Sequence, residues 1–218
     1  MTGSHQRSAG VRLADEVRAL LVDLHALDPT SEALVEAADR VADARNQLGE
    51  ALRLRWYEVP ADELDDDAEE RLRVEYRDHS LFRGERSPLA PPLSVTTSES
   101  SAGTAIVVGE VRVDRCHEGP PGRIHGGYVA GLFDDVLSGT LGLVDAGPAF
   151  TARLKVRYRK PTPIDADLRF EAWVERQSGR RLIARAHCLA GGEVTAEAEA
   201  LFVTVSRDQE RRQGTDTT

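Results

Sequence analysis

The feature that most constrains the fold is an apolar-faced segment, residues 127–144, followed closely by four strand-like segments. Mostly apolar residues recur on one side of this segment at helical spacing, namely Val129, Leu132, Phe133, Val136, Leu137, Thr140 and Leu143. The strand-like segments are 149–159, 166–176, 181–190 and 193–205, with turns at Pro161-Thr162-Pro163, Ser178-Gly179 and Gly191-Gly192. Two more precede the helix, at 93–99 and 104–113. This order predicts an α+β domain in which one antiparallel sheet wraps around one long central helix.

The first 60 residues predict a helical extension. Apolar residues repeat at near-helical spacing through 11–27, and again from a cap at Thr30 or Ser31 to about Arg55. Two simple amphipathic helices form a helical hairpin on the outside of a domain, or an oligomerisation or partner-binding element. The chain therefore divides into a helical extension (1–60), a connector (61–92), the sheet-and-helix domain (93–206) and a disordered tail (207–218). Within the connector, the acidic run 62–70 is expected to be solvated and 83–92, rich in glycine and proline, to be extended.

Composition excludes several classes of function. The net charge of -9 argues against nonspecific nucleic-acid binding. No apolar run reaches the roughly 18 residues that a membrane span needs, so no membrane partner is expected. Residues 1–10 lack the apolar centre of a signal peptide, and two cysteines do not make a disulfide framework. These features predict a cytoplasmic protein.

The candidate site is the segment 118–127, which reads Glu-Gly-Pro-Pro-Gly-Arg-Ile-His-Gly-Gly. Glycines and prolines shape a tight loop, and Gly126 and Gly127 carry no side chain, so a ligand can approach their backbone. A helix that starts here offers unpaired N–H groups and the positive end of its dipole, which suit a developing oxyanion. Asp134, further along the same helix, supplies a carboxylate for base or nucleophile chemistry.

A basic stripe follows on the strand 149–159. If the strand alternates strictly, one face carries Thr151, Arg153, Lys155, Arg157 and Arg159. The other face then carries Ala152, Leu154, Val156 and Tyr158. Arginine forks match phosphate oxygens, so the stripe suits a phosphorylated ligand, although a solvated strand face or an oligomer interface balanced by acids is also consistent with it.

Together these motifs resemble the hotdog-fold acyl-CoA thioesterases of the PaaI-like branch. The resemblance covers about residues 83–205 and is strongest to the subgroup that includes the mammalian mitochondrial acyl-CoA thioesterases. It rests on the 118–127 loop with His125-Gly126-Gly127, on Asp134 nine residues after the histidine, and on Thr151 and Tyr158-Arg159-Lys160-Pro161. It implies hydrolysis of an acyl-CoA to a free acid and CoA without a cofactor or a metal.

The resemblance also implies roles for individual residues. Asp134 would deliver the water oxygen as general base or nucleophile, and the N–H of Gly126, with that of Gly127, would polarise the thioester carbonyl. His125 would hold the loop and line the acyl site, and Thr151 would assist the attacking water. Related proteins have an asparagine about six residues before the histidine, where this chain has Gly119. Glu118 is then the nearest polar candidate for the second contact with the substrate carbonyl or the water.

Nucleotide contacts would fall at Arg157, Arg159, Arg180 and Arg181. Hotdog enzymes are dimers, and geometry favours a site between two chains. His125 and Asp134 are nine residues apart, about 13 Å of rise and about 180° of rotation on one helix. Across a two-fold axis, the start of one helix can face the middle of another, so a homodimer or a dimer of dimers is expected. Asp135 would point about 100° away from Asp134, as a neighbour or a dimer contact.

Three alternatives remain open. The first is a non-catalytic acyl-CoA-binding or regulatory module, which would keep the pocket and the stripe but would not need Asp134. The second, a hydratase or dehydratase of enoyl thioesters, is disfavoured because here the acid lies on the helix and the histidine precedes it. The third, a zinc site at Cys116-His117 or His187-Cys188, is disfavoured because adjacent strand residues point to opposite faces.

Overall fold

A computed structural model of the chain describes residues 2–60, 63 and 65–206; the predicted disordered tail lies outside these residues. Its helices are α1 (Thr2–Ala26), α2 (Ser31–Gln47), α3 (Asp66–Asp78) and α4 (Gly126–Ser138), with 3-10 turns η2 (Arg115–His117) and η3 (Gly139–Val144). Its strands are β1 (Ser94–Glu99), β2 (Ala105–Arg112), β3 (Ala149–Tyr158), β4 (Asp167–Ser178), β5 (Arg181–Ala190) and β6 (Glu193–Thr204).

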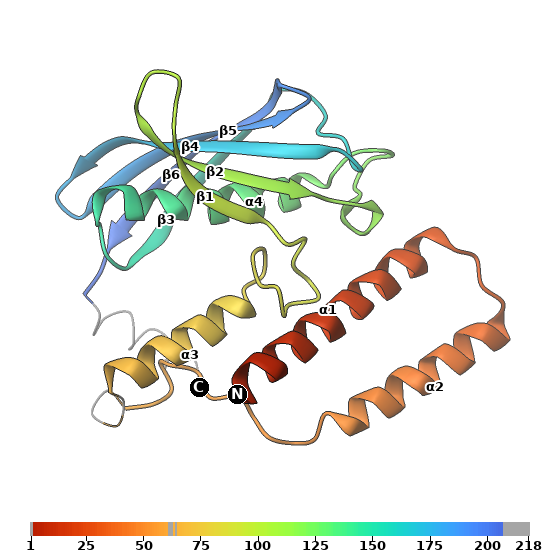
Figure 1. Ribbon diagram of the computed structural model, residues 1–218. Helices are drawn as coiled ribbons and strands as arrows, with labels where there is room; N and C mark the ends of the chain where they lie inside the picture. The colour runs from red at the N-terminus through yellow and green to blue at the C-terminus, as the bar shows by residue number, and fades with distance from the viewer. Residues whose placement is uncertain (1, 61–62, 64, 207–218) are drawn as a thin grey trace.

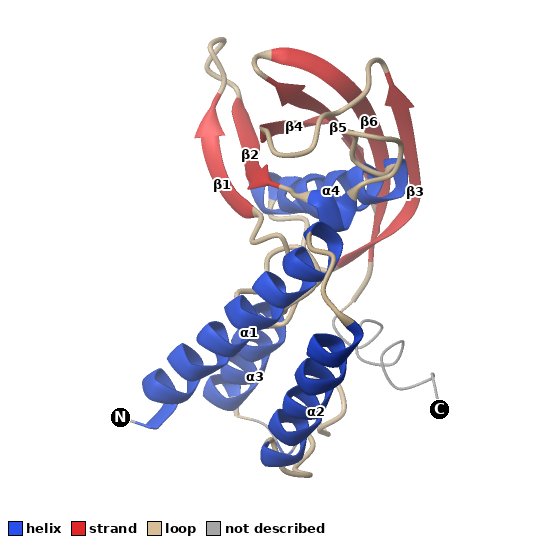
Figure 2. Ribbon diagram, turned by 90° about the vertical axis from the view of Figure 1, so that its right-hand side faces the viewer, coloured by secondary structure: helices blue, strands red, loops and turns tan. Residues whose placement is uncertain are grey.

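The six strands form one antiparallel sheet in the order β1-β2-β4-β5-β6-β3. The sheet curves around α4, and α1, α2 and α3 lie on the side of α4 away from the sheet (Figures 1 and 2). The predicted α+β arrangement is therefore confirmed, and the six strands begin and end within two residues of their predicted bounds. β1 and β3 are the edges of the sheet within the described part of the chain.

The core lies between α4 and the concave face of the sheet. α4 buries Val129, Leu132, Phe133, Val136 and Leu137, the face that its sequence periodicity predicts. Phe133 meets Phe170 of β4 edge to face, with ring centroids 5.0 Å apart. Buried alanines on the central strands give the helix room to approach the sheet: Ala172, Ala184, Ala186, Ala196, Ala198 and Ala200.

A β-bulge changes the expected alternation of β3. The register against β6 shifts between Thr151 and Arg153, so Ala152 is an extra residue. Leu154 and Val156 pack against the core, and Thr151 bonds to a residue of α4. The prediction that Thr151 shares a face with Arg153 and the other basic residues is therefore wrong, because the bulge turns its side chain toward the helix.

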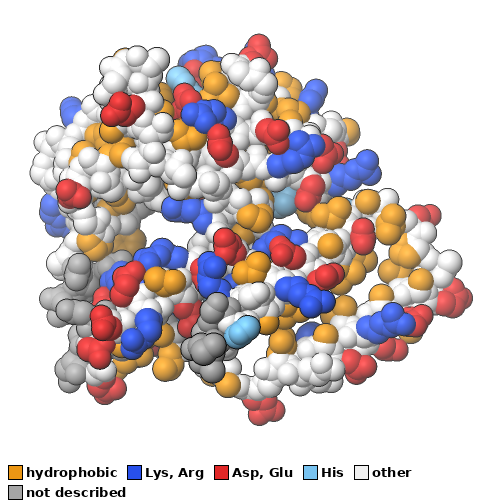
Figure 3. Space-filling view, in the orientation of Figure 1, with side chains coloured by type: hydrophobic (Ala, Val, Ile, Leu, Met, Phe, Trp, Pro, Cys, Tyr) orange, Lys and Arg blue, Asp and Glu red, His pale blue; other side chains and the backbone are white. Residues whose placement is uncertain are grey.

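The helical extension differs from the prediction at both helices. α1 begins at Thr2, earlier than residue 11, and α2 ends at Gln47 rather than near Arg55. α1 is tied to the connector, since Arg7 Nε donates to Asp78 Oδ2 (2.8 Å) and Arg18 donates to the carbonyl oxygen of Glu85 (2.7 Å). α2 has no buried residue, and its apolar side chains lie between charged ones (Figure 3).

The predicted connector contains a helix that sequence analysis missed. α3 is capped by Asp65, whose side chain accepts a hydrogen bond from the N–H of Ala68. The guanidinium of Arg73 in α3 lies 3.8 Å from the ring centre of Trp56, which is buried. Downstream, a Cβ added at Gly84 would lie 2.6 Å from backbone atoms of Ser80, so the turn there needs glycine. The connector thus contains a helix that packs on Trp56 of the extension and a turn that depends on glycine.

Among the described helices, none combines the length and the apolar character that a membrane crossing requires.

Candidate active site

The loop of residues 118–125 is closed by its own groups. Glu118 and Ile124 form a β-bridge, and the N–H of Gly119 donates to the carbonyl of Arg123 (2.9 Å). Gly122 has a φ of +71°, a conformation that favours glycine, and its N–H donates to Glu118 Oε1. The Glu118 side chain therefore holds the loop, where sequence analysis expected a contact with substrate.

His125 links this loop to α4 as the N-cap residue. Its own N–H donates to the carbonyl of His117 (2.8 Å), and its Nδ1 accepts from the N–H of Gly127 (3.1 Å). The N–H of Gly127 is thus already engaged. Within the described part of the chain, the N–H of Gly126 has no hydrogen-bond acceptor, and it lies at the positive end of the α4 dipole. Gly126 is therefore the better placed of the two glycines to polarise a carbonyl.

Tyr158 fixes the position of Gly126, a contact that sequence analysis missed. Its hydroxyl donates to the carbonyl of Gly126 (2.6 Å), and a Cβ at Gly126 would lie 3.2 Å from that hydroxyl oxygen. A cleft of about 430 Å³ opens here. It is lined by Pro120, Arg123, Ile124, Gly126, Val129, Tyr158, Arg159, Lys160, Pro161 and Thr162. The glycine end of α4 thus has room for a ligand beside basic side chains. The sequence held a signal for the contact between Tyr158 and Gly126, because the predicted alternation places Tyr158 on the apolar face of the strand that carries Thr151.

Asp134 and Thr151 meet at the other end of α4. Thr151 Oγ1 donates to Asp134 Oδ1 across 2.9 Å, and Asp134 is half-buried. The bulge at Ala152 produces this contact, because it turns Thr151 toward the helix. The pair lies beside β3, the sheet edge whose outer side is open in the described chain. A carboxylate next to a hydroxyl at an accessible edge can accept a proton from water or attack an electrophile.

Asp135 faces the connector, where Arg83 forms an ion pair with it. Burial raises the pKa of Asp135, the Arg83 charge opposes that rise, and the neighbouring Asp134 adds to it. The expected alternatives for Asp135 included a dimer contact, but its charge is matched within its own chain.

Gly126 and Asp134 of one chain are too far apart to act on one carbonyl. Eight residues of helix separate their Cα atoms by about 12 Å. Each bonds to a different residue of β3, Gly126 to Tyr158 and Asp134 to Thr151. One chain therefore carries the two halves of a site at separate places along one sheet edge.

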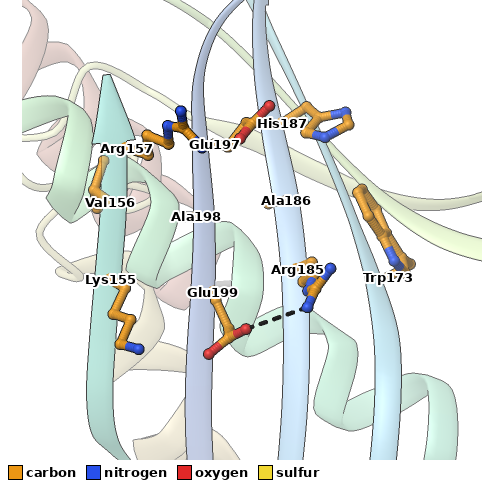
Figure 4. Close-up of a pocket in the computed structure, with 10 residues that line it drawn as sticks. All are labelled: Lys155, Val156, Arg157, Trp173, Arg185, Ala186, His187, Glu197, Ala198 and Glu199. Carbon is orange, nitrogen blue, oxygen red and sulfur yellow. Dashed lines mark hydrogen bonds and ion pairs between the residues drawn. The ribbon is translucent and has the colours of Figure 1, made fainter. Parts of the chain in front are cut away.

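The basic stripe lies on the outer face of the sheet and is partly neutralised. A groove of about 640 Å³ there includes Lys155, Arg157 and Arg185, with Glu197 and Glu199 between them (Figure 4). Arg153 pairs with Glu199 (3.4 Å) and Arg159 with Glu197 (2.8 Å), and the hydrogen bond from Arg159 lowers the pKa of Glu197.

The four predicted nucleotide contacts do not meet within one chain. Arg157 and Arg159 lie near the end of β3, where Tyr158 pairs with Ala196. Arg180 donates to the carbonyl of Thr204 (2.9 Å), and Arg181 pairs with Val203, at the other end of the sheet.

No group of metal-ligating side chains suited to a metal ion occurs among the described residues. Cys188 is buried, and the rings of His187 and Trp173 meet edge to face with centroids 5.0 Å apart. His187-Cys188 is one of the two pairs that sequence analysis considered for zinc. The other, Cys116-His117, lies in the 3-10 turn η2 and not on a strand as expected, and the His117 ring lies against that of Tyr128.

Part of the chain is similar to known thioesterases. Residues 121–197 match the family model of the thioesterase superfamily. Acyl-coenzyme A thioesterase THEM4 of Mus musculus is 31% identical over 94 residues, which cover 43% of this chain and 40% of that protein. Acyl-coenzyme A thioesterase THEM5 of Homo sapiens is 29% identical over 98 residues, 44% of this chain and 39% of that protein. The chain thus matches about 40% of the length of these curated relatives.

A solved structure extends the likeness to most of the chain. The crystal structure of a thioesterase superfamily protein superposes with a TM-score of 0.67 and 25% identity, covering 89% of this chain and 94% of that one. α4, which carries Gly126 and Asp134, and β3, which carries Thr151, both fall within residues 121–197, as does the loop from residue 121 onward. The sheet-and-helix domain therefore has the hotdog fold, and its residues 121–197 are similar to the thioesterase superfamily.

Proposed function

We propose that this chain is an acyl-CoA thioesterase whose active sites form between two copies of the chain. The observation that carries the proposal is the Asp134–Thr151 hydrogen bond at the open β3 edge, a carboxylate held in place beside an accessible surface. The N–H of Gly126, which has no acceptor among the described residues, supplies the complementary half. The names of the curated relatives, both acyl-coenzyme A thioesterases, support the substrate class.

In this mechanism the thioester carbonyl oxygen accepts a hydrogen bond from Gly126 of one chain. Asp134 of the other chain takes a proton from water, whose oxygen attacks the carbonyl carbon, or attacks the carbon itself. The negative charge that develops on the carbonyl oxygen is stabilised by the N–H and by the helix dipole. The C–S bond then breaks, and the CoA sulfur leaves as a thiolate that takes up a proton. In the nucleophilic route, water then hydrolyses the mixed anhydride between Asp134 and the acyl group, which releases the free acid and restores the carboxylate. Thr151 keeps the carboxylate oriented in every step.

In this proposal, a two-fold axis beside β3 brings Gly126 of one chain close to Asp134 of the other. If the β3 strands of two copies pair antiparallel, the Tyr158 end of one lies near the Thr151 end of the other. Such pairing also covers an edge that otherwise exposes unpaired backbone groups. It brings Arg157 and Arg159 of one copy toward Arg180 and Arg181 of the other, which assembles a basic surface for the CoA phosphates.

A non-catalytic acyl-CoA-binding module is the second candidate. The helical extension favours it, because α1 and α2 add no group to the Asp134–Thr151 pair or to Gly126.

The two candidate functions differ in whether the chain turns over its ligand. A panel of short, medium, long and aryl acyl-CoAs, assayed for thiol release with the full chain, should yield steady turnover of at least one member. Saturable acyl-CoA binding without thiol release from any member would establish the binding module instead.

A further inference from the structure

A cavity of about 410 Å³ lies between α1, the connector and the start of α4. Its volume falls within the range of small-ligand sites. It is lined by Arg18, Leu21, Val22, His25, Leu81, Pro88, Leu89, Ala90, Pro91, Pro92, Arg112, Asp114, Cys116, His117 and Tyr128. The residues from α1 and the connector lie outside the segment that matches the thioesterase superfamily.

The walls of this cavity are mainly apolar, and their side chains range from exposed to buried. Leu81 and Leu89 at the mouth are 53% and 61% exposed, which is high for leucine, while Ala90 and Pro91 are buried. Leu21 and Val22 of α1 are half-buried. Exposed apolar side chains that lead to a buried floor are typical of a site for an apolar group.

Two buried polar atoms in the cavity wall have no hydrogen bond among the described residues. They are the hydroxyl of Tyr128 and Nδ1 of His117, whose rings lie 4.1 Å apart. His117 Nδ1 is 3.2 Å from a carboxylate oxygen of Asp114, but without hydrogen-bond geometry. Buried polar groups normally have partners, so a ligand that offers a hydrogen-bonding group would satisfy these two.

Two of the charged side chains in the cavity wall, Arg18 and Arg112, are paired, and the Asp114 carboxylate accepts a hydrogen bond from the N–H of Cys116 (3.0 Å). Arg18 forms an ion pair with Asp15 and donates to backbone carbonyls, and Arg112 pairs with Asp167 (3.2 Å). Burial lowers the pKa of His117 and raises that of the Tyr128 hydroxyl, and burial together with Asp114 raises the pKa of Cys116 to about 11. The imidazole, the phenol and the thiol are therefore neutral at pH 7, which suits an uncharged ligand and not the phosphates of CoA.

The cavity also adjoins the glycine that polarises the carbonyl. Tyr128 follows Gly127 directly, and consecutive Cα atoms are about 3.8 Å apart. The carbonyl of His117 accepts from the N–H of His125 (2.8 Å), so the cavity wall and the 118–125 loop share a hydrogen bond. The cavity and Gly126 therefore share the first turn of α4.

We propose that this cavity holds the distal part of the acyl group, and that it favours a medium-length, uncharged acyl chain with a hydroxyl or keto group near its end. The inference rests on the proposed thioesterase function. It gives α1 and the connector a role in substrate selection, with Leu21 contacting the apolar stem and the Tyr128 hydroxyl contacting the polar group.

The test compares kcat/KM for acetyl-, octanoyl- and ω-hydroxyoctanoyl-CoA in three variants. Leu21→Trp fills the cavity and should lower kcat/KM at least about 10-fold for both octanoyl substrates, while acetyl-CoA, too short to reach it, is unaffected. Leu24→Trp is the matched control, because Leu24 lies on the same helix, is 53% exposed and does not line the cavity. Tyr128→Phe keeps the ring and should lower the preference for the ω-hydroxy substrate about 5- to 10-fold, the size expected for one lost hydrogen bond.

The outcomes separate the two proposals. A selective loss in Leu21→Trp, together with a reduced hydroxyl preference in Tyr128→Phe, supports the cavity as the acyl site. Unchanged substrate profiles in both variants would overturn this inference and leave the thioesterase function standing. Absence of hydrolysis in the wild-type chain would overturn both. If Leu21→Trp does not fold, the Tyr128→Phe profile alone decides.

Discussion

Replacing Gly126 with proline should lower kcat about 100- to 1000-fold, the range expected for the loss of one oxyanion donor. Proline removes the Gly126 N–H, which has no acceptor within the described chain. The backbone conformation at this position is compatible with proline. Gly126 is the first residue of α4, a position that proline favours. His125 before it has φ -60° and ψ 130°, which residues preceding proline readily adopt.

Gly126→Ala is the matched control. It adds the same Cβ, 3.2 Å from the Tyr158 hydroxyl, but keeps the N–H. Alanine should therefore retain most of the activity, whereas proline should not, and both variants should unfold at similar temperatures. Equal kcat values for the two variants would remove Gly126 from the mechanism. The comparison isolates a backbone donor, which side-chain substitutions cannot ordinarily do.

Asp134→Asn should lower kcat at least about 100-fold, because general acid–base catalysis by one side chain contributes about 10² to 10⁴. Asparagine keeps an oxygen that can accept the Thr151 hydroxyl proton, so the local geometry is preserved while the base is lost. Binding of CoA should change little, since the predicted nucleotide contacts are arginines. The measurement is thiol release at saturating substrate, with CoA affinity determined by calorimetry.

Asp135→Asn is the control for Asp134→Asn. It makes the same change one residue further along α4, at a carboxylate that pairs with Arg83 of the connector. Its kcat should stay within a few-fold of wild type. If Asp135→Asn lowers kcat as much as Asp134→Asn does, the loss of one negative charge from α4 explains both effects, and Asp134 is not a catalytic carboxylate.

The sheet-and-helix domain could be predicted because its signals are local. The apolar face of α4 follows a helical period, and the turns carry glycine with positive φ at Gly179, Gly191 and Gly192. α3 was missed because its acidic start resembles a solvated loop, and its packing partner, Trp56, lies outside the helix. The bulge at Ala152 was missed for a similar reason. A prediction from strict alternation assumes that no extra residue interrupts the strand. The bulge becomes visible only in the structure, through the register with β6 and the Thr151–Asp134 hydrogen bond.

The candidate site was predicted residue by residue but not in its arrangement. Asp134 and Thr151 were singled out separately, and the structure brings them together through the bulge. Gly127 was expected to share the oxyanion role, but the capping bond to His125 engages its N–H. Such bonds depend on side-chain positions in three dimensions, which neither spacing nor composition specifies.

The most direct test is to mix the two inactive variants. If the proposed site takes Gly126 from one chain and Asp134 from another, a hybrid of Gly126→Pro and Asp134→Asn subunits has one doubly damaged site and one intact site. Random exchange should then restore roughly a quarter of wild-type thiol release, because half of the dimers are hybrids and half of their sites are intact. A mixture that stays as inactive as its parents, although native mass spectrometry shows that the subunits have exchanged, would contradict the shared site.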